Sequence, residues 1–308
     1  MQWIRDGATA RRRDGETAGG EPGRENGPMA HDDVPSPAAR TVHLAASGVD
    51  ARILPDPHGD GHVLEVGGHV QSHVDLARPA EVRHEYLRRI ANVLDLLAPA
   101  GEPLRVLHLG GGALTLPRYV AATRPGSPQT AVDLDRELMG LVLQELPLSA
   151  DADVEVVVAD ARAAVDDLLD PLDGETTAGA WDAVVLDIDT DAGAVAHLTG
   201  AGFHAELLAL LAPGGALLVN VGDDDGLAHL GTQLAALETA CAEAGVPGPW
   251  TLGPAPVLER LELGNAVLAA GPGLRELDRD ALAAAGPHPG LVLDEHGTAE
   301  LAERIGRG

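Results

Sequence analysis

The chain has 308 residues, of which 45% are hydrophobic, and a formal net charge of −27 at pH 7. This acidic balance excludes nucleic acid as a partner, because such a surface repels phosphate backbones, and no apolar run approaches the roughly 18 residues that a membrane span needs. The absence of lysine excludes Schiff-base catalysis and a Walker-type phosphate loop, while a single cysteine, Cys241, excludes a disulfide framework and fits a reducing cytoplasm.

The N-terminal part of the chain divides into two segments. Residues 1–40 are rich in Gly, Pro, Arg and acids and lack a periodic apolar face, so we expect a disordered tail, within which Met29 is a second candidate start of translation. Residues 41–80 show short alternating apolar runs separated by the turn signals "PDPHGDG" and "GG". This pattern predicts a small antiparallel β unit.

The next segment is a helix followed by alternating strands and helices. Tyr86, Ile90, Leu94 and Leu97 share one helical face, and the helix is expected to stop at Pro99. The "LAPGG" stretch ending at Gly215 has the pattern of a helix C-terminus. Apolar strand patterns separated by helical segments then predict a doubly wound α/β domain over residues 81–272, with residues 273–308 as a C-terminal extension. The predicted strands are 104–109, 130–134, 154–159, 182–187, 215–221 and 265–271.

Three consecutive glycines, Gly110, Gly111 and Gly112, follow the first strand of this domain. In a doubly wound sheet the ligand lies beyond the carboxyl ends of the strands, and glycines there let the backbone approach it closely. The dinucleotide fingerprint requires a further glycine where Thr115 stands, so NAD is disfavoured.

Carboxylates follow the next three strands. Asp133 is placed to accept hydrogen bonds from a ribose, Asp160 from the exocyclic amine of an adenine, and Asp187 faces the same crevice. Each alone is typical of a helix cap or a solvated acid. Three in register behind a glycine turn favour an adenosyl-type ligand, in a Rossmann-like sheet of the S-adenosylmethionine methyltransferase type.

Four histidines, His58, His62, His69 and His73, fall within the small β unit. His69 and His73 are predicted to point to the same side of a strand. No cysteine or well-spaced third ligand joins them, so we interpret all four as surface residues and expect no metal site.

The order of these motifs resembles the spermidine synthase (polyamine aminopropyltransferase) family over roughly residues 45–272. The quoted motifs are "GGHVQSHVDL", the "HE" helix start, "LGGG", "VDLD", "DAR" and "WDAVVLDIDTDAGAVAHL". The resemblance implies a homodimer. Such an enzyme transfers an aminopropyl group from decarboxylated S-adenosylmethionine to a small amine such as putrescine.

The resemblance also assigns roles to individual residues. It implies that Asp187 is the proton acceptor and that the glycine turn, Asp133 and Asp160 hold the nucleoside. The implied cofactor-binding residues are Gln71, His84, Gly110, Gly111, Gly112, Asp133, Asp160 and Ala161.

Some positions depart from the family pattern. Arg83, Ala113 and Thr190 stand where the family has Tyr, Asp and Asp, and "APVLERLELGN" lacks the family's "TYPSG" loop. Asp189 and Asp191 are candidate substitutes for binding the cationic substrate. Because Ala113 removes a negative charge near the amino acid end of the cofactor, a methyltransferase using intact S-adenosylmethionine remains an alternative. A non-catalytic adenosyl-binding protein is the third.

Overall fold

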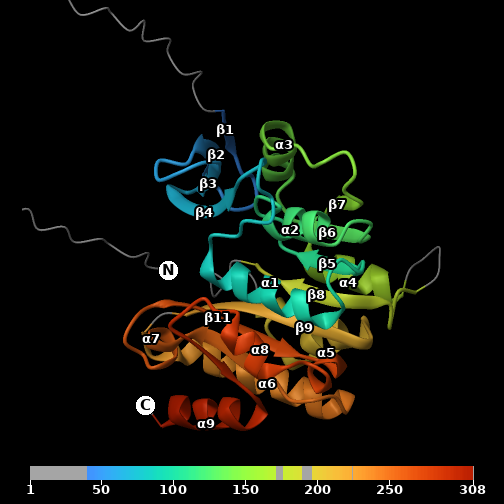
Figure 1. The fold of residues 1–308 in the computed structure, drawn as a ribbon, viewed down its shortest axis with the longest axis vertical. Coiled ribbons are helices and arrows are strands. Elements are labelled where there is room, and N and C mark those ends of the chain that lie inside the picture. The colour runs from blue at the N-terminus through green and yellow to red at the C-terminus, as the bar shows by residue number, and fades with distance from the viewer. Residues whose placement is uncertain (1–39, 171–175, 189–195, 224, 308) are drawn as a thin grey trace, which may run out of the picture.

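The computed structural model describes residues 40–170, 176–188, 196–223 and 225–307 (Figure 1). The predicted tail, apart from Arg40, lies outside these residues. The described part forms a small antiparallel sheet and a large mixed sheet covered by helices. No helix in these ranges is long and apolar enough to cross a membrane.

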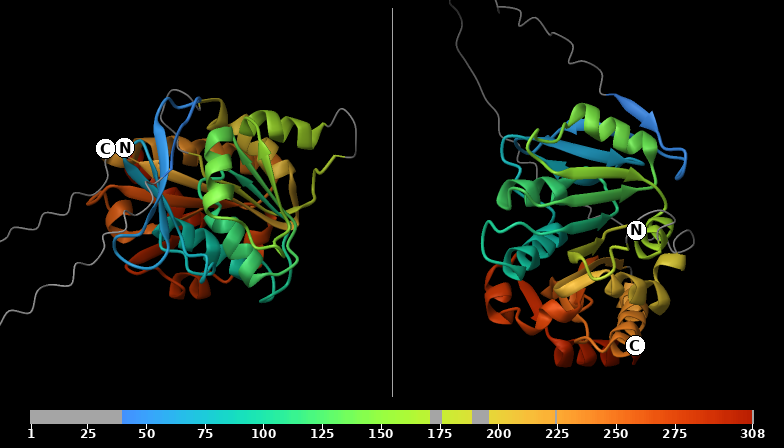
Figure 2. Two further views of the ribbon diagram at one scale, coloured as in Figure 1. Left: turned by 90° about the horizontal axis from the view of Figure 1, so that it is seen from above. Right: turned by 90° about the vertical axis from the view of Figure 1, so that its right-hand side faces the viewer.

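The small sheet confirms the predicted N-terminal β unit. Its strands lie in chain order, each antiparallel to the next. One face packs against helices α2 (Thr115–Thr123) and α3 (Arg136–Glu145) of the large domain (Figure 2). The strands are β1 (Thr41–His43), β2 (Asp50–Pro55), β3 (His62–Val66) and β4 (His69–Val74).

The large sheet confirms the predicted Rossmann-like α/β class. Its strand order is β12-β10-β11-β9-β8-β5-β6-β7, and the five strands from β9 to β7 are parallel to one another. β10, β11 and β12 pair antiparallel at the other end. The strands are β5 (Val106–Leu109), β6 (Gln129–Asp133), β7 (Val154–Val158), β8 (Trp181–Leu186), β9 (Leu211–Asp223), β10 (Trp250–Pro254), β11 (Gly264–Ala270) and β12 (Gly290–Leu293).

Helices cover both faces because alternate residues of each strand are apolar on opposite sides. On β8, Ala183 and Val185 pack under α1 (Glu85–Leu97), α2 and α8 (Arg279–Ala284). Val184 and Leu186 pack under α4 (Ala161–Leu169), α5 (Ala201–Ala209) and α6 (Ala228–Ala244). The two remaining helices are α7 (Ala255–Leu258) and α9 (Glu295–Gly306).

The prediction for "LAPGG" was wrong. α5 already ends at Ala209, and β9 begins at Leu211 with an irregularity in its pairing opposite β8. A Cβ on Gly215 would lie 2.6 Å from the carbonyl oxygen of Trp181. The glycine is therefore required for close approach of two strands and does not end a helix.

Arg124, which follows α2, holds the C-terminal end of α1. It is 2% exposed and donates to the carbonyl oxygens of Leu94, Asp95, Ala98, Pro99 and Glu102 at 2.8–3.0 Å. The last carbonyls of a helix have no partner within the helix, so this guanidinium satisfies groups that would otherwise be buried without one.

We predict that Arg124→Met lowers the free energy of unfolding by at least about 3 kcal/mol, because several buried carbonyls lose their donor. Urea unfolding measures this change. Arg307→Met is the matched control, since Arg307 is 75% exposed and forms a surface ion pair with Glu303, and its cost should stay within about 0.5 kcal/mol. Equal effects of the two substitutions would contradict the capping role of Arg124.

His204 on α5 makes the fold sensitive to acid. The side chain is fully buried, neither ring nitrogen has a partner among the described residues, and burial lowers its pKa from 6.5 to about 4. Below pH 6.5 the unfolded chain takes up a proton that the folded chain cannot bind until about pH 4, so stability falls with pH in this window.

We predict that His204→Leu removes the part of the acid-induced loss of stability that is due to His204. Relative to the wild type, the variant should gain about 1.4 kcal/mol of stability per pH unit as the pH falls from 6.5 towards 4. Denaturant unfolding at several pH values measures the difference. Parallel pH profiles of the two proteins would show that the ring can be protonated in the folded state.

Candidate functional site

The glycine turn lies between the ends of β6 and β8. Gly110 has a φ of +102°, and a Cβ there would lie 2.1 Å from the backbone oxygen of Asp187. Its N–H donates to the oxygen of Val132 at 2.8 Å, while the N–H of Asp187 donates to Leu109 at 2.8 Å. Only glycine fits this position, and the turn leaves the N-terminus of α2 facing the edge of the sheet.

Asp133, at the end of β6, supports the turn. Its Oδ2 accepts from the N–H groups of Gly111 at 2.8 Å and Gly112 at 3.3 Å, and its Oδ1 accepts from Asp135 at 2.9 Å. Burial raises the pKa of Asp133, although these three hydrogen bonds oppose the shift. A carboxylate has about four lone-pair sites, so one remains for a ribose hydroxyl.

Asp160 occupies the N-cap of α4, the role typical of an aspartate in such a position. Its Oδ1 accepts from Arg162 at 3.0 Å and Ala163 at 3.1 Å, and its Oδ2 lies 3.3 Å from the ring of His197. Although burial raises the pKa of Asp160, the hydrogen bonds from Ala163 and His197 hold it below its usual range. Ala161 is the buried first residue of α4.

Asp187, just beyond β8, is held on both oxygens. Tyr86 on α1 donates its hydroxyl to Oδ2 at 3.3 Å, and Asn220 on β9 donates its amide to Oδ1 at 2.8 Å. Asn265 on β11 in turn donates to the amide oxygen of Asn220 at 3.0 Å. The sequence analysis missed Tyr86, Asn220 and Asn265. The only signals were a tyrosine after the "HE" pair and an asparagine near the end of each of two strands.

His84 and Gln71 lie on the small-sheet side of the glycine turn. His84 is the N-cap of α1, its ring centroid lies 6.3 Å from that of Tyr86, and burial together with the nearby His73 lowers its pKa. Its Nδ1 is buried and has no partner among the described residues. Gln71 lies on β4, whose next residue, Ser72, has its hydroxyl 3.3 Å from where a Cβ on Gly112 would be.

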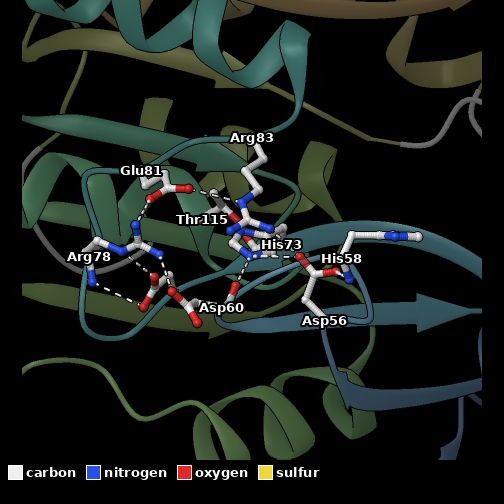
Figure 3. Close-up of polar contacts among 9 residues, drawn as sticks. Asp56, His58, Asp60, His73, Arg78, Glu81, Arg83 and Thr115 are labelled. Carbon is white, nitrogen blue, oxygen red and sulfur yellow. Dashed lines mark hydrogen bonds and ion pairs between the residues drawn. The ribbon is translucent and has the colours of Figure 1, made fainter.

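The interpretation of His73 as a surface residue was wrong. The His73 side chain is 3% exposed, whereas His58 and His69 are exposed. His69 and His73 do not share an environment, because β3 and β4 shift register between Leu64 and Glu65. Figure 3 shows the ring of His73 facing the turn after β2, where its Nε2 lies 2.9 Å from the backbone oxygen of Asp60.

A charged network joins this turn to the segment before α1 (Figure 3). Arg83 pairs with Asp56 and with Glu81, at 3.1 Å to the latter, and Asp56 also lies 3.5 Å from His73. Arg78 pairs with Asp75, Asp60 and Glu81 at 2.8–3.1 Å. Arg83 is therefore occupied by carboxylates of the small sheet and its adjoining loop.

Asp189 and Asp191 lie outside the described residues, so their predicted substrate contacts stay predictions, and Thr190 lies outside them as well. Among the residues that the structure describes, no group of three or more His, Cys, Asp or Glu side chains is arranged to hold a metal ion.

We predict that Gly110→Ala costs at least about 3 kcal/mol of folding free energy, because the new Cβ meets the Asp187 backbone in a strained conformation. Gly140→Ala is the control: Gly140 lies in the middle of α3 with open space around it, and alanine there should stabilise the protein by about 1 kcal/mol. Thermal unfolding compares the two. A Gly110→Ala protein as stable as the wild type would contradict the turn geometry.

Comparisons with known proteins find similarity to solved structures. No family model and no curated protein sequence matches the chain. Among solved structures, a probable spermidine synthase from Corynebacterium glutamicum is 25% identical with a TM-score of 0.72, over 87% of this chain and 94% of that one. A spermidine synthase in complex with the transition state analogue AdoDATO is 14% identical with a TM-score of 0.54, over 87% of each chain.

A third solved structure, spermidine synthase from Thermotoga maritima, is 16% identical with a TM-score of 0.54, over 88% of this chain and 87% of that one. These two lower-identity structures share the fold, and the first shares both the fold and a quarter of its residues. The chain is therefore similar to spermidine synthases in fold and diverges from them in sequence.

Proposed function

We propose that the chain is an aminopropyltransferase that moves the aminopropyl group of decarboxylated S-adenosylmethionine to a small amine such as putrescine. The observation that carries the proposal is the Asp187 carboxylate, which Tyr86 and Asn220 hold beside the glycine turn. The similarity to solved spermidine synthases supports a transferase acting with an adenosyl co-substrate.

The residues of the turn fit an adenosyl group. Gly110, Gly111 and Gly112 give the turn a backbone without side chains, which a nucleoside can approach closely, and Asp133 keeps an acceptor site for the ribose. The buried Nδ1 of His84 offers a further polar contact on the small-sheet side. Gln71, Asp160 and Ala161 are proposed to complete the nucleoside site.

In this reaction the protein mainly aligns the amine with the propyl carbon and accepts the proton of the amine. The amine nitrogen attacks the propyl carbon bonded to sulfur, the carbon–sulfur bond breaks, and its electron pair stays on sulfur to give 5′-methylthioadenosine. The nitrogen becomes more acidic as it forms the new bond, and its proton passes to the Asp187 carboxylate. The net charge of −27 favours the approach of a cationic amine.

One observation supports the methyltransferase alternative. Ala113 is 1% exposed and packs with Leu114 and Met139 beneath the small sheet, so the turn carries no carboxylate at this position. A site without that charge does not repel the carboxylate of intact S-adenosylmethionine.

We predict that Asp187→Asn lowers turnover by about two to four orders of magnitude, the usual contribution of a positioned general base. Affinity for methylthioadenosine should change little, because the nucleoside contacts remain. The assay measures methylthioadenosine formed from decarboxylated cofactor and putrescine. Asp182→Asn is the matched control, since Asp182 lies at the opposite end of β8 and contacts the backbone N–H of Arg105.

Parallel assays separate the alternatives. Formation of S-adenosylhomocysteine from the intact cofactor by the wild type would replace the proposal with a methyltransferase. Binding of methylthioadenosine with neither product, across a panel of amines, would identify a non-catalytic adenosyl-binding protein.

A further inference from the structure

Three neighbouring strands place polar side chains in a row at the edge of the large sheet. Asp187 follows β8, Asn220 lies on β9 and Asn265 lies on β11, and these strands are adjacent in the order β11-β9-β8. Strand alternation puts all three on the face that α1 covers, since Val185, Leu218 and Val267, each two residues away, belong to the apolar cluster under α1.

Asn265 reaches Asn220 diagonally across the β9–β11 pair. In the register of these strands Asn265 lies opposite Gly222, and Asn220 lies opposite Val267. Gly222 has no side chain to separate the two amides, and they meet at 3.0 Å. Such diagonal neighbours are within reach of each other on one face of an antiparallel pair.

The direction of both hydrogen bonds follows from the carboxylate. An ionised Asp187 can only accept, so the amide NH₂ of Asn220 must face it, at 2.8 Å. The amide oxygen of Asn220 then faces Asn265, which must donate. Both amide dipoles point the same way, and consecutive hydrogen bonds of this kind strengthen one another.

We propose that Asn265 is a positioning residue that acts on Asp187 through Asn220, and that this amide relay fixes how the carboxylate meets the acceptor amine. The inference rests on the proposed role of Asp187. Tyr86 holds the other carboxylate oxygen at 3.3 Å, so the relay and the tyrosine together fix the plane of the group.

Kinetics of single and double variants test the relay. Asn220→Ala should lower kcat about 10- to 100-fold, the effect of losing one hydrogen bond to a charged group, with KM for the adenosyl co-substrate unchanged. Asn265→Ala should lower kcat about 3- to 10-fold. Asn265→Asp should lower kcat more, because the new carboxylate competes with Asp187 for the amide NH₂ of Asn220.

The double variant separates relay from through-space effects. In the Asn220→Ala background, Asn265→Ala should change kcat by less than about twofold, because the intermediate amide is gone. Leu261→Asp is the charge control for Asn265→Asp: Leu261 is 72% exposed and lies four residues before Asn265. Additive effects of the two alanine substitutions, or an equal loss in Leu261→Asp, would overturn the relay.

A spectroscopic test needs no activity. The chain contains four asparagines, at positions 26, 92, 220 and 265, so ¹⁵N-asparagine labelling gives few side-chain amide signals. Asp187→Ala should shift the amide signals of Asn220 and, through it, those of Asn265. The Asn92 amide, which donates to the oxygen of Gly286 at 2.8 Å, should stay in place.

The two kinds of failure are distinguishable. Wild-type protein without transferase activity would defeat the proposed function alone, and the amide signals would still decide the relay. Asn265 signals that ignore both Asp187→Ala and Asn220→Ala would overturn the relay whatever the activity.

Discussion

The close approach of Gly110 to the backbone of Asp187 is the constraint on which the candidate site depends. A Cβ at position 110 would lie 2.1 Å from the Asp187 oxygen, so the first turn of the large domain passes directly against the end of β8. This contact brings the turn that is expected to hold a nucleoside next to the carboxylate that is expected to take a proton. A wider turn would separate binding from chemistry.

Two of the three carboxylates at this edge bind backbone N–H groups, which limits their part in the chemistry. Asp133 accepts three backbone N–H groups and thereby shapes the turn, and Asp160 caps α4. The carboxylate of Asp187 differs, because Tyr86 and Asn220, which belong to other elements, donate to it from their side chains. Neither of these two donors is a backbone group, which makes Asp187 the carboxylate best suited to reaction.

The departures from the family pattern have physical counterparts. Arg83 is neutralised by Asp56 and Glu81, so the cation adds to the link between the small sheet and α1. Ala113 is buried among apolar side chains. The Asn220–Asn265 contact adds polar groups on the β9 and β11 side of the site. The site is therefore polar on the side of Tyr86 and the amides, and apolar around Ala113.

The sequence by itself determined the two-sheet architecture, the parallel strands, the glycine turn and the strand-end positions of Asp133, Asp160 and Asp187, because periodicity, glycines and turn acids are local signals. The sequence did not predict β10 and β12, since each strand is short and bordered by Pro or Gly. Tertiary structure alone decided that His73 is buried, that His197 lies beside Asp160, and that Asn220 meets Asn265. These outcomes depend on strand register and on contacts between residues 37 to 45 positions apart, which no local pattern encodes.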